Sequence, residues 1–212
     1  MRRTFPVLFA ATALVFAASA HAAAPSTDAR PVRASSLSGA LLSAQVAERD
    51  NDFAGAIDFY QQALGFDPGN AGFEQSLMVA LITKGEFDKA LPLAEKLKAV
   101  PEIERVSRIA LAVNAVNKDD FAQAETLLKL ALQNDLDRLV SGLMTAWVKQ
   151  GAKDTDGALK TLADLQGPDW YDVFKRIHKA LILDNAGRAE AAQAAYQEAL
   201  DTPDASAAPE AW

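Results

Sequence analysis

Five alanines recur along the chain at one fixed interval. They are Ala56, Ala90, Ala124, Ala158 and Ala192, and each step is 34 residues without insertion or deletion. The first belongs to the pattern Phe53-x-x-Ala56-x-x-x-Tyr60-x-x-Ala63. A small residue followed one turn later by a bulky one lets two helices pack closely. Because a single helical pair cannot bury its apolar face alone, this period predicts an all-α chain of stacked helix-turn-helix units.

Turn signals divide the chain into ten helical segments. Polar clusters such as 50–52 and 84–86 mark turns within pairs, and breaks such as 67–70 mark the boundaries between pairs. The predicted helices span 37–49, 53–65, 71–84, 87–99, 102–117, 121–133, 137–150, 155–165, 169–186 and 188–201. The sequence thus predicts five helical pairs.

The repeat resembles that of the tetratricopeptide family, of a secreted bacterial type. Gly85, Phe87 and Ala90 match the family's motif. Further matches are Phe53, Ala56, Tyr60, Ala63, Pro68, Gly187, Ala192, Tyr196 and Ala199. The large aromatic residue usual near the start of each repeat is missing, and Ala40, Glu74, Arg108, Gly142 and Arg176 stand there instead. The resemblance implies a right-handed α-solenoid of about five 34-residue repeats.

The resemblance covers about residues 37–206. It implies repeats at 37–70, 71–104, 105–138, 139–172 and 173–206. Residues 23–36 are expected to be a flexible lead-in, since they offer little to bury. The end of the chain, 207–212, is expected to open a further repeat, which would make this chain part of a longer protein, or to be a short tail.

Two sets of residues follow from the resemblance. In this family the first helix of each pair lines a concave face, which implies an apolar stripe for binding a partner polypeptide: Leu41, Val79, Ile109, Val113, Leu143, Trp147, Ile177 and Leu181. The set that packs the repeats is Ala56, Tyr60, Ala90, Ala124, Ala158, Ala192 and Tyr196. The stripe suits an amphipathic helix or an apolar extended segment. Packing of the same side chains between helices is the alternative.

The N-terminus predicts an export signal. Two arginines precede an apolar stretch, and Ala20-His21-Ala22 supplies the small-x-small pattern of a cleavage site. Cleavage is expected after Ala22, with Ala24 as the second choice, and an uncleaved anchor is the alternative. Residues 1–22 are therefore predicted to be a signal peptide, and the rest to reach the periplasm without a membrane span.

Several kinds of chemistry find no support in the sequence. There is no cysteine, so disulfides and thiolate metal sites are excluded. A net charge of −7 argues against nucleic acid as a partner. His178 is expected to be structural rather than catalytic. Asp119-Asp120 and Asp154-Thr155-Asp156 are expected to cap helices rather than to bind calcium. Lysines and arginines are interspersed with acids rather than clustered, which predicts solvated faces.

These observations favour a non-catalytic protein–protein interaction scaffold of the periplasm, with no cofactor and no metal. Its partners are expected to be proteins or peptides of the cell envelope. The alternative is the N-terminal regulatory or binding part of a longer cell-envelope enzyme. Self-association is a third expectation, since exposed ends of repeat arrays can stack on each other.

Overall fold

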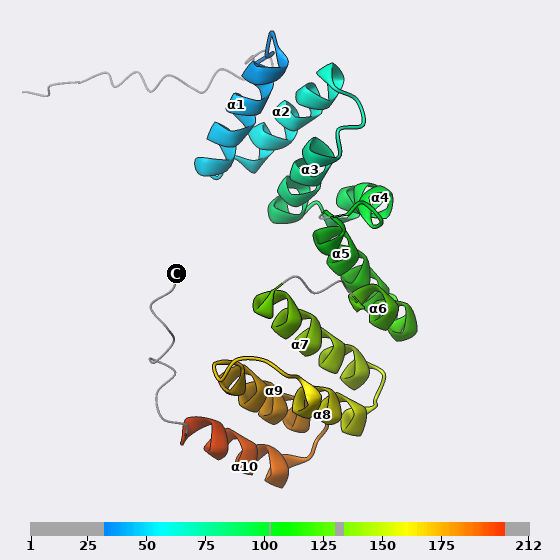
Figure 1. The fold of residues 1–212 in the computed structure, drawn as a ribbon, viewed down its shortest axis with the longest axis vertical. Coiled ribbons are helices and arrows are strands. Elements are labelled where there is room, and N and C mark those ends of the chain that lie inside the picture. Colours follow the sequence, from blue (N-terminus) through cyan, green and yellow to red (C-terminus); the bar gives the residue numbers. More distant parts are fainter. Residues whose placement is uncertain (1–31, 102, 130–133, 202–212) are drawn as a thin grey trace, which may run out of the picture. The chain divides into compact units, whose positions relative to one another are not determined.

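A computed structural model describes residues 32–101, 103–129 and 134–201, and these fold into ten α-helices without a β-strand (Figure 1). The helices are α1 (Leu37–Arg49), α2 (Phe53–Phe66), α3 (Ala71–Lys84), α4 (Phe87–Leu97), α5 (Glu104–Asn117), α6 (Phe121–Leu128), α7 (Asp135–Gly151), α8 (Thr155–Asp164), α9 (Tyr171–Asn185) and α10 (Ala189–Leu200). The ten predicted helices are confirmed, and only the end of α6 differs by more than two residues. The predicted signal peptide and residues 207–212 lie outside the described residues.

Helices pack in consecutive pairs. α1 packs on α2, α3 on α4, α5 on α6, α7 on α8 and α9 on α10. Each second helix also contacts the first helix of the next pair, and α7 contacts α9. The described chain is therefore an all-α helical repeat solenoid, as the sequence predicts.

The turns within the pairs repeat one backbone conformation. One or two residues after each first helix stands a residue with a positive φ, and these five residues lie 34 apart: Asn51 (58°), Gly85 (86°), Asp119 (59°), Lys153 (65°) and Gly187 (73°). This left-handed conformation ends a helix, and glycine adopts it without the steric cost that a Cβ atom brings. The sequence period is thus a period of backbone geometry.

Aspartates begin three of the five second helices. The carboxylates of Asp52, Asp120 and Asp154 each accept a hydrogen bond, at 2.9 to 3.1 Å, from the backbone N–H three residues later. Glu86 and Arg188 stand at the same place in the other two pairs without such a bond. The prediction that Asp120 and Asp154 cap helices is confirmed.

The alanines at the 34-residue interval lie at the centre of the helical pairs. All five are at most 2% exposed, and Tyr60 is buried beside them while Tyr196 is half-buried. The core of the described residues falls into three clusters. The first joins α1 to α6 and includes Val148 of α7, the second joins α7, α8 and α9, and the third joins α9 and α10. The division between the first two clusters falls next to α7.

α6 is shorter than the sequence predicts. It ends at Leu128, whereas helical periodicity alone extends it to residue 133. The guanidinium of Arg108, on α5, donates to three main-chain carbonyls at this end, those of Thr126 (3.1 Å), Leu127 (3.0 Å) and Lys129 (2.9 Å). Carbonyls at a helix C-terminus have no partner within the helix, so Arg108 supplies one from outside.

Candidate binding site

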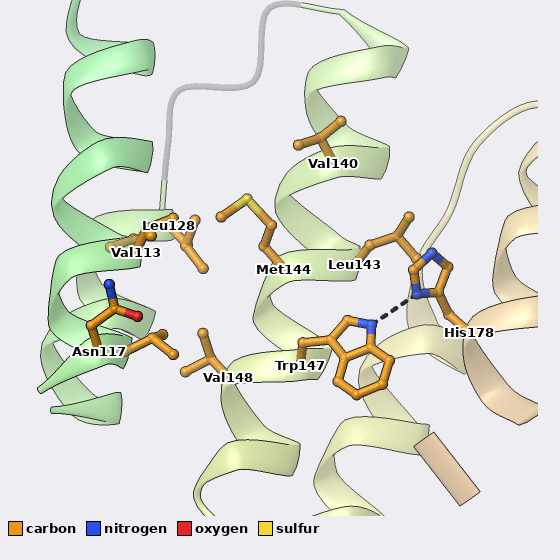
Figure 2. A pocket seen from close by; sticks show the side chains of 11 residues that line it. Val113, Asn117, Leu128, Val140, Leu143, Met144, Trp147, Val148 and His178 are labelled. Carbon is orange, nitrogen blue, oxygen red and sulfur yellow. Dashed lines mark hydrogen bonds between the residues drawn. The ribbon is translucent and has the colours of Figure 1, made fainter. Parts of the chain in front are cut away.

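A pocket of about 490 Å³ opens where the first and second core clusters meet (Figure 2). Its walls come from α5, α6, α7 and α9. The lining residues are Ala112, Val113, Val116, Asn117, Leu128, Val140, Leu143, Met144, Trp147, Val148 and His178. The volume lies within the range of sites that hold small molecules or the side chains of a bound peptide.

The lining is apolar except at two places. Asn117, at the end of α5, and His178, on α9, lie at opposite sides of the lining, with Leu143, Met144 and Val148 between them (Figure 2). Among the described residues, no carboxylate, ammonium or guanidinium group belongs to the lining. Since desolvating a charge is costly, the pocket favours an uncharged apolar occupant.

Trp147 and His178 are joined by a hydrogen bond across the repeat boundary. The indole Nε1–H donates to His178 Nδ1 at 2.8 Å, and the rings meet edge to face with centroids 6.2 Å apart. An indole N–H can only donate, so His178 Nδ1 is the unprotonated nitrogen and Nε2 carries the proton of the neutral ring. Burial lowers the pKa of His178, which favours the same neutral form. His178 is an ordered acceptor, as expected of a structural histidine, and it also reaches the pocket.

The structure brings together three of the eight residues of the apolar stripe. Val113, Leu143 and Trp147 line the pocket. The other five lie outside the lining: Leu41, Val79, Ile109, Ile177 and Leu181. Leu41 and Ile109 pack on the first core cluster, so packing between helices holds for part of the stripe. Val79, Ile177 and Leu181 are exposed.

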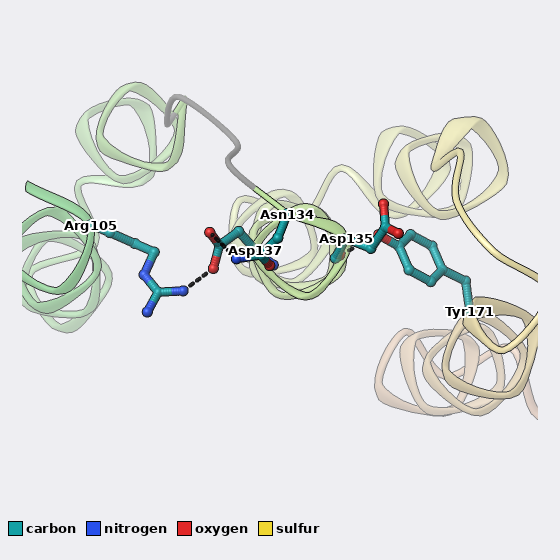
Figure 3. Close-up of polar contacts among 5 residues, drawn as sticks. All are labelled: Arg105, Asn134, Asp135, Asp137 and Tyr171. Carbon is teal, nitrogen blue, oxygen red and sulfur yellow. Dashed lines mark hydrogen bonds and ion pairs between the residues drawn. The ribbon is translucent and has the colours of Figure 1, made fainter. Parts of the chain in front are cut away.

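Charged side chains connect helices at positions where the sequence predicts solvated faces. Asp137 of α7 is only 5% exposed and pairs with Arg105 of α5, and it also accepts from the Asn134 amide at 3.0 Å (Figure 3). Glu74 of α3 is 6% exposed and pairs with Lys96 of α4. For Asp137 and Glu74 the prediction of a solvated face is wrong. Their partners are distant in sequence, and interspersed charges carry no signal of that pairing.

Tyr171 connects the starts of α7 and α9. Its hydroxyl donates to the main-chain carbonyl of Asp135, and the ring is buried (Figure 3). Burial raises the pKa of the Tyr171 phenol, and the nearby Asp135 carboxylate adds to this effect. This contact helps to fix α7 against α9, and thereby Trp147 against His178.

A second hollow, of about 400 Å³, lies between α8 and α9 and has a different character. Its polar lining residues are Asp172, Lys175, Arg176 and Lys179. Lys175 donates to the Leu165 carbonyl at 3.1 Å, and Lys179 pairs with Glu198 at 2.8 Å. These cations serve the packing of α9, which leaves the apolar pocket as the stronger candidate for a binding site.

No three histidine or acidic side chains of the described part come together as metal ligands. Within residues 32–101, 103–129 and 134–201, no helix combines the length and the apolar character needed to cross a bilayer.

The fold and the pocket define a helical repeat protein, a class whose stacked pairs present extended surfaces for binding. The sequence model of the tetratricopeptide repeat-like domain family matches residues 89–211. The chain belongs to this family, and the resemblance seen in the sequence is confirmed. No curated protein sequence matches the chain.

Solved structures of tetratricopeptide proteins share the fold. MamA protein is similar with a TM-score of 0.63 and 17% identity, over 77% of this chain and 90% of MamA. A second MamA structure, from MSR-1, has a TM-score of 0.59 and 16% identity, over 77% and 94% of the two chains. The TPR-like repeats of a kinesin light chain from Podosopora anserina are similar with a TM-score of 0.62 and 15% identity, over 77% of this chain and 93% of that chain. At these identities the likeness is one of fold.

Proposed function

We propose that this protein is a non-catalytic scaffold that binds partner polypeptides on its first helices. One observation carries the proposal: large hydrophobic side chains exposed to solvent gather on α1, α3, α5, α7 and α9. They are Leu42, Val46, Val79, Val113, Leu136, Phe174, Ile177 and Leu181, whereas the second helices expose only Phe66 and Leu200 in the described part of the chain. An exposed apolar surface of this kind is typical of a protein-binding site.

The location of this scaffold is part of the proposal. The basic start, the apolar stretch and the Ala20-His21-Ala22 pattern support export to the periplasm, where its partners would be envelope proteins. The full chain, produced in a bacterium, is expected to be recovered from the periplasmic fraction with Ala23 as its first residue. Intact mass of the purified protein measures this directly. Recovery of the chain from the membrane fraction with Met1 retained would show that residues 1–22 are an uncleaved anchor and not a signal peptide.

The binding surface can be tested at two exposed positions away from the pocket. Val79 and Leu181 are each 38% exposed and lie outside the pocket lining. The double variant Val79→Asp with Leu181→Asp should lose the envelope proteins that the immobilised wild type retains. The two new carboxylates, on α3 and α9, would have to be desolvated when a partner binds there. Asp58→Asn, on the exposed side of α2, is the matched control and should retain them.

Circular dichroism decides whether the double variant remains folded. Both side chains are substantially exposed, so the helical signal should be unchanged. Equal retention of the same proteins by the wild type and by the folded double variant would refute binding on the first helices.

A further inference from the structure

Two polar side chains with unused hydrogen-bonding groups lie at opposite sides of the pocket (Figure 2). The Asn117 amide makes no hydrogen bond to another described residue, and His178 uses only Nδ1, which accepts from Trp147. His178 Nε2–H and both ends of the Asn117 amide therefore remain available. Between them the walls are aliphatic, apart from the Met144 thioether and the ring of Trp147 (Figure 2).

This distribution distinguishes an extended occupant from a helical one. The main-chain N–H and C=O groups in the middle of a helix bond to each other, so they would leave Asn117 and His178 unused. An extended segment presents main-chain groups on both sides of each side chain, and these can pair with an amide and an imidazole N–H. The polar groups on the two sides thus match the main chain on either side of one inserted side chain.

Charge adds a further requirement. The lining has no charged side chain, so the inserted residue has to be apolar. The whole chain carries a net charge of −7, so positive residues flanking the inserted one would favour association.

We propose that the pocket binds one bulky apolar side chain of an extended segment flanked by lysine or arginine, with Asn117 and His178 hydrogen-bonded to the main chain on its two sides. This inference rests on the proposed function, and it names the chemistry of the partner at one place on the surface. It also chooses between the amphipathic helix and the extended segment that the apolar stripe suits equally well.

The probe is a seven-residue peptide, Lys-Ser-Ser-Phe-Ser-Ser-Lys, acetylated and amidated at its ends. Binding is followed on the full chain by the NMR signal of the Trp147 indole N–H, which Trp147→Phe identifies by its loss. The peptide should shift this signal saturably. Replacing its Phe with Ala, or both Lys with Glu, should weaken binding, and a stapled helical peptide with the same Phe and Lys should bind no better than the Ala peptide.

Two valines provide a matched pair of variants. Val113 and Val79 are each 38% exposed and occupy equivalent places 34 residues apart, but only Val113 lines the pocket. Val113→Asp should lower the affinity for the Phe peptide by at least about tenfold. Val79→Asp should leave this affinity within about twofold of the wild-type value. Equal effects of the two substitutions would overturn the assignment of the pocket.

His178 provides the test of the hydrogen bond. His178→Asn keeps an acceptor near the position of Nδ1 but removes the Nε2 donor, whereas His178→Gln places an amide N–H near Nε2. The Asn variant should bind the Phe peptide about three- to tenfold more weakly, which is the loss expected for one hydrogen bond, and the Gln variant should recover part of it. Unchanged affinity in both variants would remove His178 from the proposal.

The two proposals fail separately. If Val79→Asp with Leu181→Asp abolishes retention of envelope proteins but the Phe peptide leaves Trp147 unperturbed, the scaffold stands and the pocket does not bind such a segment. If the helical peptide binds best, the partner enters as a helix and the extended segment is wrong.

Discussion

At the scale of single residues, the Trp147–His178 hydrogen bond connects the pocket to the packing of the repeats. It joins α7 to α9, and it holds His178 in its neutral form with Nδ1 as acceptor. Protonation would turn Nδ1 into a donor, which faces the indole N–H without an acceptor between them. The charge of His178 therefore affects both the binding of an occupant in the pocket and the packing of α7 against α9.

The stability of the protein should fall between pH 7.5 and pH 5.5 because of His178. Burial lowers the pKa of His178 below its ordinary value of 6.5. As the pH falls through about 6.5, the unfolded chain therefore binds a proton that the folded chain does not, and unfolding becomes more favourable. The loss is expected to be below about 1.4 kcal/mol at pH 5.5. Urea unfolding at the two pH values measures it.

The control for this prediction is His178→Asn, which should show a smaller loss. Glu86 does not interfere, because its pKa is lowered to about 2 by hydrogen bonds from Lys84 and Lys89. The contribution of Glu86 to stability is fully present above pH 4.5 and disappears only as the pH falls towards 2. An identical pH dependence in the wild type and in His178→Asn would show that His178 does not carry the effect.

At the scale of elements, the turn within each helical pair should limit stability where its left-handed residue is not glycine. Lys153 has a φ of 65°, and its Cβ atom makes this conformation costly. Lys153→Gly is expected to stabilise the protein by up to about 1 kcal/mol, after the greater freedom of glycine in the unfolded chain is subtracted. Thermal or urea unfolding provides the measurement.

Lys153→Ala separates the backbone from the side chain. It removes the lysine but keeps a Cβ atom, so it should give no such gain. The reverse change, Gly85→Ala, should cost about 1 kcal/mol, because a Cβ atom at Gly85 meets no neighbour and the cost is that of the backbone alone. A gain of equal size for Lys153→Ala and Lys153→Gly would contradict the argument.

The helices could be predicted because their determinants are local and repeat every 34 residues. The early end of α6 could not, because it depends on Arg108, a residue of another helix that takes over the carbonyls at that end. The pocket was predictable in part for the same reason. Val113, Leu143 and Trp147 follow from their place in the repeat, whereas His178 became part of the site through a hydrogen bond between helices.

At the scale of the whole molecule, the core formed by the described residues is divided into clusters. The first cluster belongs mainly to α1 to α6, and the second to α7, α8 and α9. In repeat arrays stability is a sum of contributions from single repeats and from their contacts with neighbours. Opening of one part can therefore precede opening of the other.

Leu162→Ala should loosen one side of this division more than the other. Leu162 is 3% exposed and belongs to the second cluster, so its truncation is expected to cost about 2–5 kcal/mol locally. The hydrogen-exchange rates of the backbone amides should rise in α7 to α10 and change little in α1 to α4. Met78→Ala, in the first cluster, should give the opposite pattern. A uniform rise along the chain in either variant would show a single cooperative unit.

The left-handed residues at 51, 85, 119, 153 and 187 have a consequence for inheritance. A segment that runs from just after one of them to the next contains a whole repeat and ends in the backbone conformation from which it began. Duplication or loss of such a segment in the gene joins two ends that already fit. The length of the array can thus change by one unit at a time, and natural selection has to adapt side chains at the junction rather than devise a new turn.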